Sequence, residues 1–255
     1  MTDINARLQK HYDAAVAHFG KNAVFGVFLY GSWNYETNLP TSDVDTKCIL
    51  IPDLFTLAIK PFKVTHLHID DEVCECMSIM HMVENWKKQN INFVEIMFTP
   101  YFKLNPSYAD FWEEKAIGFF EPFALSIEKS EKVARYDLKK AVLSMANQAI
   151  HTIKQDPTDL KKIMNGARIA HSLSLLTGDN PPSYAEIIRA PYRIAQIRTG
   201  ETKVSEVEVQ SLLRYFEEMI ASADQWAPNK EEQKEVDDFL NDFILNLINY
   251  RISIN

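Results

Sequence analysis

The chain has 255 residues, of which 46% are hydrophobic and 24% charged, with 35 acidic against 27 basic side chains. This composition predicts one large domain or two small ones with ample apolar material for a core. The net charge of -8 argues against a protein that coats nucleic acid. No apolar run approaches the roughly 18 residues of a membrane span. We therefore expect a soluble, cytoplasmic protein whose partners include neither a membrane nor an extended nucleic acid.

The first part of the chain alternates between helical and β-type patterns. Apolar residues at helical spacing over 8–19, followed by Gly20 as a cap, predict the first helix. Another helix is expected over 78–89. Strands are expected over 24–30, 43–51, 63–69, 72–79 and 92–99.

After about residue 105 the pattern becomes helical throughout. Amphipathic helices are expected over 130–153, 159–176, 204–223 and 230–248. We therefore predict an α+β protein with two domains. Residues 1–125 would form a mixed, largely antiparallel sheet with flanking helices, and residues 126–255 an all-helical domain.

The cysteines and paired histidines favour structural roles. The sequence contains no C-x-x-C motif. Its three cysteines lie in apolar segments, which is typical of small buried side chains; they are Cys48, Cys74 and Cys76. His66 and His68 alternate on one predicted strand, but no further ligand is visibly placed beside them. We interpret them as ordinary strand histidines.

Two carboxylates at the start of the second predicted strand are the first candidates for chemistry. Asp43 and Asp45 are separated by one residue, so in a strand they would project to the same side roughly 7 Å apart. Two like charges at that distance repel each other unless a cation lies between them. Mg²⁺ suits such oxygen ligands and binds substrate phosphates as well.

The Gly31-Ser32 pair, which ends the preceding strand, supplies a complementary phosphate site. A glycine allows close backbone approach, and its amides together with the Ser32 hydroxyl can hold phosphate oxygens. A metal site beside a phosphate site indicates phosphoryl or nucleotidyl transfer. The sequence contains no P-loop motif, which excludes a P-loop NTPase. It also contains no G-x-S-x-G motif, so a serine hydrolase with a nucleophile elbow is not supported.

The order of these motifs resembles the DNA polymerase β type nucleotidyltransferase superfamily, whose signature is hG[GS] followed by [DE]h[DE]h, with h apolar. The matching segments here are Tyr30-Gly31-Ser32 and Asp43-Val44-Asp45-Thr46, with Thr46 departing from the apolar last position. The chain also looks like a branch of predicted nucleotidyltransferases. The segments similar to that branch are Asn90 to Glu95, the helix from Arg168 to Gly178, and Ile197 to Gly200.

The resemblance implies a third carboxylate beside Asp43 and Asp45, so that these three residues would be both catalytic and metal-binding. We favour Glu75, inside a predicted strand just before a helix. Glu95 and Glu72 remain alternatives. For Glu95 we favour a structural role, bonded to the loop amides.

The resemblance also suggests nucleotide-binding residues beyond Gly31 and Ser32. Lys47 lies on the strand face of Asp45 and would contact phosphate, or else act only as a charge partner for the acids. The Ser42 hydroxyl would contact the nucleotide or cap its turn. In the helical domain the candidates for triphosphate contact are Lys139, Lys140 and Arg168, with Tyr136 and Gln148 as further residues that could line the cleft.

The implied reaction moves a nucleoside monophosphate from an NTP, with ATP favoured, to an acceptor hydroxyl and releases pyrophosphate. Two Mg²⁺ ions, or Mn²⁺ in their place, would assist, and the helical domain would close over the nucleotide. The acceptor is a small molecule, a protein hydroxyl or an RNA end. One alternative is a nucleotide-binding regulatory module without transfer, and another is a structural partner using exposed aromatics between Tyr101 and Trp112.

Overall fold

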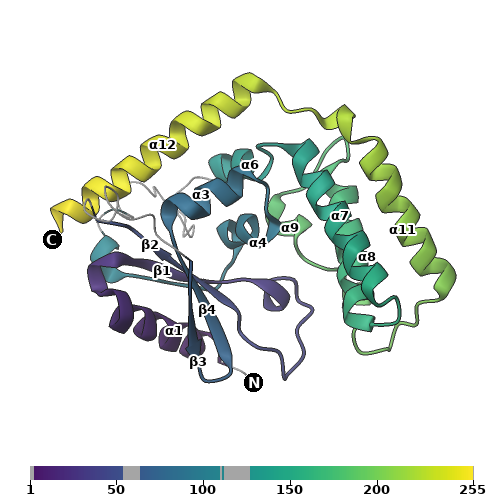
Figure 1. Cartoon of the computed structure of the whole chain (residues 1–255), viewed down its shortest axis with the longest axis horizontal. Helices are drawn as coiled ribbons and strands as arrows, with labels where there is room; N and C mark the ends of the chain where they lie inside the picture. Colours follow the sequence, from purple (N-terminus) through teal and green to yellow (C-terminus); the bar gives the residue numbers. More distant parts are fainter. Residues whose placement is uncertain (1–2, 54–63, 110, 112–126, 255) are drawn as a thin grey trace.

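A computed structural model describes residues 3–53, 64–109, 111 and 127–254 (Figure 1). These residues form a five-stranded mixed sheet followed by helices, which confirms the predicted α+β class. The expected domain boundary near residue 125 lies outside the described residues.

The sheet consists of strands in the spatial order β3-β4-β2-β1-β5. The pairs β1/β2, β1/β5 and β3/β4 are antiparallel, and β2/β4 is parallel. The strands expected over 63–69 and 72–79 are present as β3 and β4, which form a hairpin around Asp70-Asp71. The strands are β1 (Val24–Leu29), β2 (Thr46–Leu50), β3 (Thr65–Ile69), β4 (Glu72–Ser78) and β5 (Phe102–Leu104).

Helices cover both faces of the sheet, which is why β1 and β2 are buried along their whole lengths. One face packs against α1 (Ile4–Phe19), which starts at an Asp3 cap and ends at Gly20, where φ is 85°. The other face packs against α3 (Ile79–Lys87) and α4 (Ile91–Val94). β1 is therefore an apolar run throughout, as expected for a strand buried on both sides, whereas β2 begins with the buried polar residues Thr46 and Lys47.

The second half of the chain builds a separate helical core. It forms between α7 (Leu138–Gln155), α8 (Leu160–Leu176) and α11 (Glu206–Ala221). At Gly166 an added Cβ would lie 2.5 Å from a side-chain carbon of Ile153, so α7 and α8 pack closely there. Two short helices, α9 (Tyr184–Ile187) and α10 (Tyr192–Ala195), connect α8 to α11.

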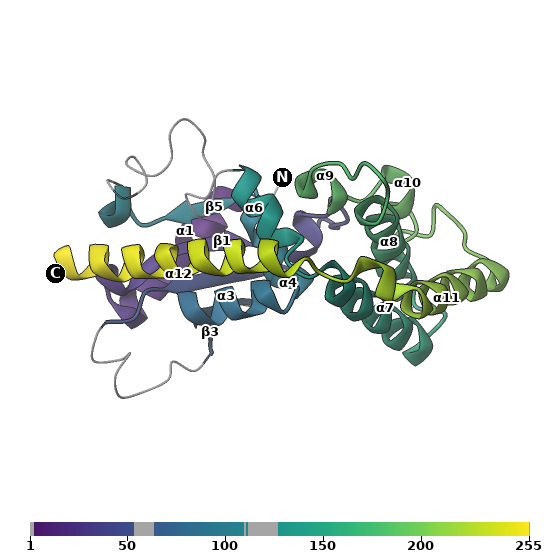
Figure 2. The ribbon, with the colours of Figure 1, turned by 90° about the horizontal axis from the view of Figure 1, so that it is seen from above.

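The last helix, α12 (Lys230–Ser253), returns to the sheet. Its buried residues Val236, Leu240, Phe243 and Leu247 belong to the core that contains Phe28 of β1. Figures 1 and 2 show α12 lying over α3, away from α7 and α8. The helices after residue 126 therefore pack in two places.

Two predicted elements differ in the structure. The expected strand over 92–99 is instead α4 followed by a 3-10 helix at Glu95–Phe98. Asn90 caps this segment by accepting a hydrogen bond from the Asn92 amide, and a short buried apolar run does not by itself separate strand from helix. The helix expected over 130–153 is broken into α6 (Ile127–Ala134) and α7.

Two further observations concern surfaces. Within the described part of the chain, none of the helices has the length and apolar character needed to span a bilayer. Among the aromatics considered for partner contact, Tyr108 and Phe111 are buried, and Tyr101 is exposed. Trp112 lies outside the described residues.

Candidate functional site

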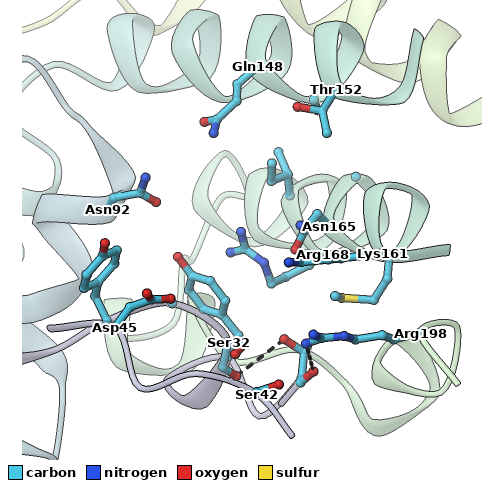
Figure 3. A pocket seen from close by; sticks show the side chains of 18 of the residues that line it. Ser32, Ser42, Asp45, Asn92, Gln148, Thr152, Lys161, Asn165, Arg168 and Arg198 are labelled. Atoms are coloured by element: carbon cyan, nitrogen blue, oxygen red, sulfur yellow. Dashed lines mark hydrogen bonds between the residues drawn. The ribbon is translucent and has the colours of Figure 1, made fainter. Parts of the chain in front are cut away.

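A cavity of about 300 Å³ lies between the loops that flank β1 and β2 on one side and helices α7 and α8 on the other. Figure 3 shows Gln148 and Thr152 entering it from α7, opposite Ser32 and Asp45. Seven of the predicted residues line it. They are Gly31, Ser32, Ser42, Asp43, Asp45, Gln148 and Arg168.

Five predicted residues are placed elsewhere. Lys140 is exposed on α7 and does not line the cavity, and the neighbouring Lys139 pairs with Asp224. Lys47 and Glu75 lie in the sheet, where they pair with each other and also do not line the cavity. Tyr136 lies in another groove and donates to Asp237.

The bend after β1 turns sharply at Gly31, whose φ is 83° and therefore favours glycine. The Gly31 amide was expected to face phosphate, but it donates to Glu95 Oε1 at 3.0 Å. The Ser32 amide and hydroxyl have no hydrogen-bond partner among the described residues. Ser32, rather than Gly31, therefore supplies the free donors of this bend.

The acidic segment is held by its backbone in front of β2. Although a strand was expected from residue 43, β2 begins at Thr46. The Asp43 carbonyl accepts from the Trp33 indole at 3.0 Å, and the Val44 amide donates to the Glu72 carboxylate at 2.8 Å. Val44 is buried, and Asp43 and Asp45 on either side of it both line the cavity, although residues 43–45 precede the strand on which the alternation argument was based.

Neither Asp43 nor Asp45 has an ion pair or a side-chain hydrogen bond among the residues that the structure describes. Burial raises the pKa of Asp45, and the negative charge of Asp43 raises it further. The opposing charges of Lys161 and Lys47 lower it. A bound cation would relieve the repulsion within this pair.

Lys47 and Glu75 form a closed pair one strand away. They are direct partners in the parallel register of β2 and β4, and their side chains form an ion pair. The Lys47 ammonium also lies 4.0 Å from the centroid of the Tyr30 ring and 4.3 Å from that of Phe93. The alternative role of Lys47, as a charge partner for an acid, agrees with this placement.

The third acid is thus not gathered with the other two. Among the described residues there is no group of three or more His, Cys, Asp or Glu side chains placed to hold a metal ion. Glu72 is engaged with Arg7 and His11. Asp43 and Asp45 fit one Mg²⁺ that shares phosphate ligands, whereas the three-carboxylate set for two ions is not assembled.

The helical wall supplies positive charge. Lys161, Asn165 and Arg168 follow one another at positions i, i+4 and i+7 of α8, so they share one face of that helix and all line the cavity. Arg198, which follows α10, also lines it and donates to the Thr37 carbonyl at 2.8 Å, a bond drawn in Figure 3. This bond fixes the wall to the loop after Gly31.

A buried polar layer lies behind the cavity. The guanidinium carbon of Arg168 is 3.6 Å from the centroid of the Tyr35 ring, and Arg168 is only 4% exposed. Its Nε and Nη1 have no hydrogen-bond partner in the described structure. Glu95 is fully buried, and burial raises its pKa to about 7. Its bond to the Gly31 amide is the structural role that the sequence favours for Glu95.

Sequence reasoning missed part of this wall. Lys161, Asn165 and Arg198 were not among the named site residues, although the seven-residue spacing of Lys161 and Arg168 on a predicted helix is a usable signal. Asn92, which also lines the cavity, was assigned to a strand.

Comparisons with known proteins add little. No model of a protein family matches the sequence, and no curated protein matches it. Among solved structures, a nucleotidyltransferase-like protein from Exiguobacterium sibiricum 255-15 aligns with a TM-score of 0.30 and 14% identity, over 85% of this chain and 75% of that chain. Similarity at this level carries no inference about activity.

Proposed function

We propose that the chain is a nucleotidyltransferase that uses an NTP and Mg²⁺ to modify an acceptor hydroxyl. The acceptor oxygen would bond to the α-phosphorus, the bond from that phosphorus to the bridging oxygen would break, and pyrophosphate would leave with the hydroxyl proton released. ATP is the favoured donor. The acceptor is a small molecule, a protein hydroxyl or an RNA end.

The observation that supports this proposal is the presence of both signs of charge, each without a partner, around one cavity. Among the described residues Asp43 and Asp45 form no ion pair, and Nε and Nη1 of Arg168 are buried donors without an acceptor. A ligand that satisfies both must itself carry a cation and an anion. A metal-bound triphosphate is such a ligand, because Mg²⁺ is commonly held by one or two carboxylates together with substrate phosphates.

The residues of the cavity would have separate roles in binding the metal, the phosphates and the rest of the nucleotide. Asp43 and Asp45 would hold Mg²⁺, which when bound neutralises phosphate charge. Ser32 and the cations Lys161 and Arg168 would bind phosphate oxygens and orient the α-phosphorus toward the acceptor. The carboxamides of Asn92 and Gln148 line the cavity as well and provide uncharged hydrogen-bonding groups for the rest of the nucleotide.

The test is a transfer assay with two matched radiolabels. Each NTP, labelled on the α-phosphate or on the γ-phosphate, is incubated with the protein and Mg²⁺, alone and with cell extract. Nucleotidyl transfer places the α label, but not the γ label, on an acceptor. The Asp43→Asn/Asp45→Asn double variant serves as the control. Transfer by this folded double variant at the wild-type rate would refute the assignment.

A second candidate is a nucleotide-binding module without transfer, and the Lys47–Glu75 pair favours it. In this arrangement the favoured third acid is neutralised by a lysine instead of facing the cavity. Calorimetry with a non-hydrolysable ATP analogue separates the two functions. Tight binding that needs no divalent metal, without transfer of either label, would favour the module.

A further inference from the structure

Glu95, Tyr35 and Arg168 form a buried layer to which the proposed transfer reaction assigns no joint role. They come from the 3-10 helix after α4, the loop after β1 and helix α8, and they are 0%, 5% and 4% exposed. The layer therefore joins the bend at Gly31 to the helical wall of the cavity.

Glu95 acts directly on the bend. Its Oε1 accepts the Gly31 amide, 64 residues earlier in the chain, at 3.0 Å. With that amide directed into the protein and φ at 83°, the next residue, Ser32, lines the cavity with its own amide and hydroxyl free. The carboxyl group thus stabilises the conformation that presents Ser32.

Arg168 is held on the other side of the layer. Its guanidinium packs on the Tyr35 ring, which leaves Nε and Nη1 without acceptors among the described residues. A buried cation requires a countercharge, and the positive charge of Arg168 lowers the pKa of Glu95, so the two side chains interact.

We propose that Glu95 is the positioning residue of a phosphate site, acting through the Gly31 amide on Ser32 and, by its protonation state, on the net charge that Arg168 and Glu95 together offer to a phosphate. This inference rests on the proposed function, because it assumes that a nucleotide phosphate binds between Ser32 and Arg168. It assigns Glu95 a role in binding rather than a place among the metal ligands.

The charge of Glu95 gives this role a signature that a structural acid lacks. A polyanion beside Arg168 disfavours a second negative charge nearby, so phosphate binding favours the protonated form of Glu95. Since burial places the pKa of Glu95 at about 7, the change falls near neutral pH. The charged and titratable groups that interact with it are Arg168, Lys47, Tyr30, Tyr35 and Tyr184.

The experiment compares Glu95→Gln, which keeps an acceptor oxygen, with Glu95→Leu, which leaves the Gly31 amide unpaired. Affinity for a non-hydrolysable ATP analogue with Mg²⁺ and for tripolyphosphate is measured by calorimetry, with thermal unfolding recorded for each protein. We expect Glu95→Gln to bind within about threefold of wild type at pH 6, and Glu95→Leu to bind about 10-fold to 100-fold more weakly.

Glu131→Leu is the matched control. Glu131 also accepts a backbone amide, that of Tyr184 at 2.6 Å, but it does not line the cavity. Its loss is expected to lower the thermal midpoint without changing affinity. Equal affinity of folded Glu95→Leu and wild type would overturn the inference.

The pH arm covers the case in which Glu95→Leu fails to fold. Between pH 6 and pH 8 the affinity of wild type relative to Glu95→Gln should fall by about tenfold. Because both proteins bind the same nucleotide at each pH, the ratio of their affinities does not depend on the titration of the nucleotide. A ratio that stays constant overturns the inference while the proposed function stands, whereas a wild-type protein that binds neither probe overturns both.

Discussion

The carboxylates on the cavity surface and those in the layer beneath it are treated differently by the fold. Asp43 and Asp45 face the cavity without partners in the described structure, whereas Glu75 is paired with Lys47 and Glu95 accepts a backbone amide. Inside the protein Glu75 is compensated by a cation, and Glu95 is compensated only in part, because one of its oxygens is buried without a hydrogen-bond partner in the described structure. The surface pair is left with repulsion, which indicates that its compensation comes from a ligand.

The largest effect is expected on the cavity surface. Asp43→Asn/Asp45→Asn should reduce nucleotide transfer on the order of 10³-fold or more, because the metal site loses both charges. Removal of the repulsion that raises the pKa of Asp45 should leave the thermal midpoint unchanged or higher. A large fall in the thermal midpoint would show that Asp43 and Asp45 make stabilising interactions within the protein. The cavity carboxylates would then not differ from the buried ones.

Next comes the pH dependence of the buried layer. Native Glu95 keeps its proton up to about pH 7, whereas the ordinary glutamate pKa is 4.5, so the folded state binds more protons between these values. Stability therefore falls as pH rises through this range, by about 3 kcal/mol from this group. Urea unfolding from pH 4.5 to pH 7.5 should show this fall in wild type relative to Glu95→Gln. If the stability of wild type and of Glu95→Gln changed with pH in the same way, the raised pKa of Glu95 would be contradicted.

Lys47→Met tests how much the ion pair between Lys47 and Glu75 stabilises the sheet. The Lys47 side chain is 2% exposed and that of Glu75 is 20% exposed, so the variant leaves a largely buried carboxylate unpaired. We expect a loss of about 2–3 kcal/mol in the free energy of unfolding at neutral pH. Adding Glu75→Gln should restore much of it. If the double variant is as unstable as the single one, the pair contributes no coupling.

The smallest effect is expected at the boundary between the two regions. Gly31→Ala places a side chain at φ 83°, where the new Cβ has ordinary contact with Asp45 at 3.6 Å, so the backbone carries the cost. That cost is about 1–2 kcal/mol. Gly20→Ala, at φ 85° beside α1, should lose comparable stability with no change in nucleotide binding. Only the Gly31 variant is expected to bind ATP more weakly.

The sequence predicts the side of the cavity that is formed by the loops flanking β1 and β2, because the residues of this side lie close together in the sequence. Ser32 ends one strand and Asp45 precedes the next, and the antiparallel pairing of β1 and β2 brings them together. The partnership of Lys47 with Glu75 depends on the parallel register of β2 and β4, which no local pattern fixes. The segment from Asn92 to Phe98 was misassigned because buried apolar runs look alike in strands and helices.

The return of α12 to the sheet affects the order in which the protein can mature on the ribosome. Phe28 of β1 shares its core with Leu247, and Arg251 donates to the carbonyl of Ile51, 200 residues earlier. A nascent chain that has emerged only as far as α11 already contains every side chain of the cavity, yet the core that includes α3 and α4 still lacks the apolar residues of α12. The apolar residues of that core therefore gain the packing of α12 only when synthesis of the last helix is complete.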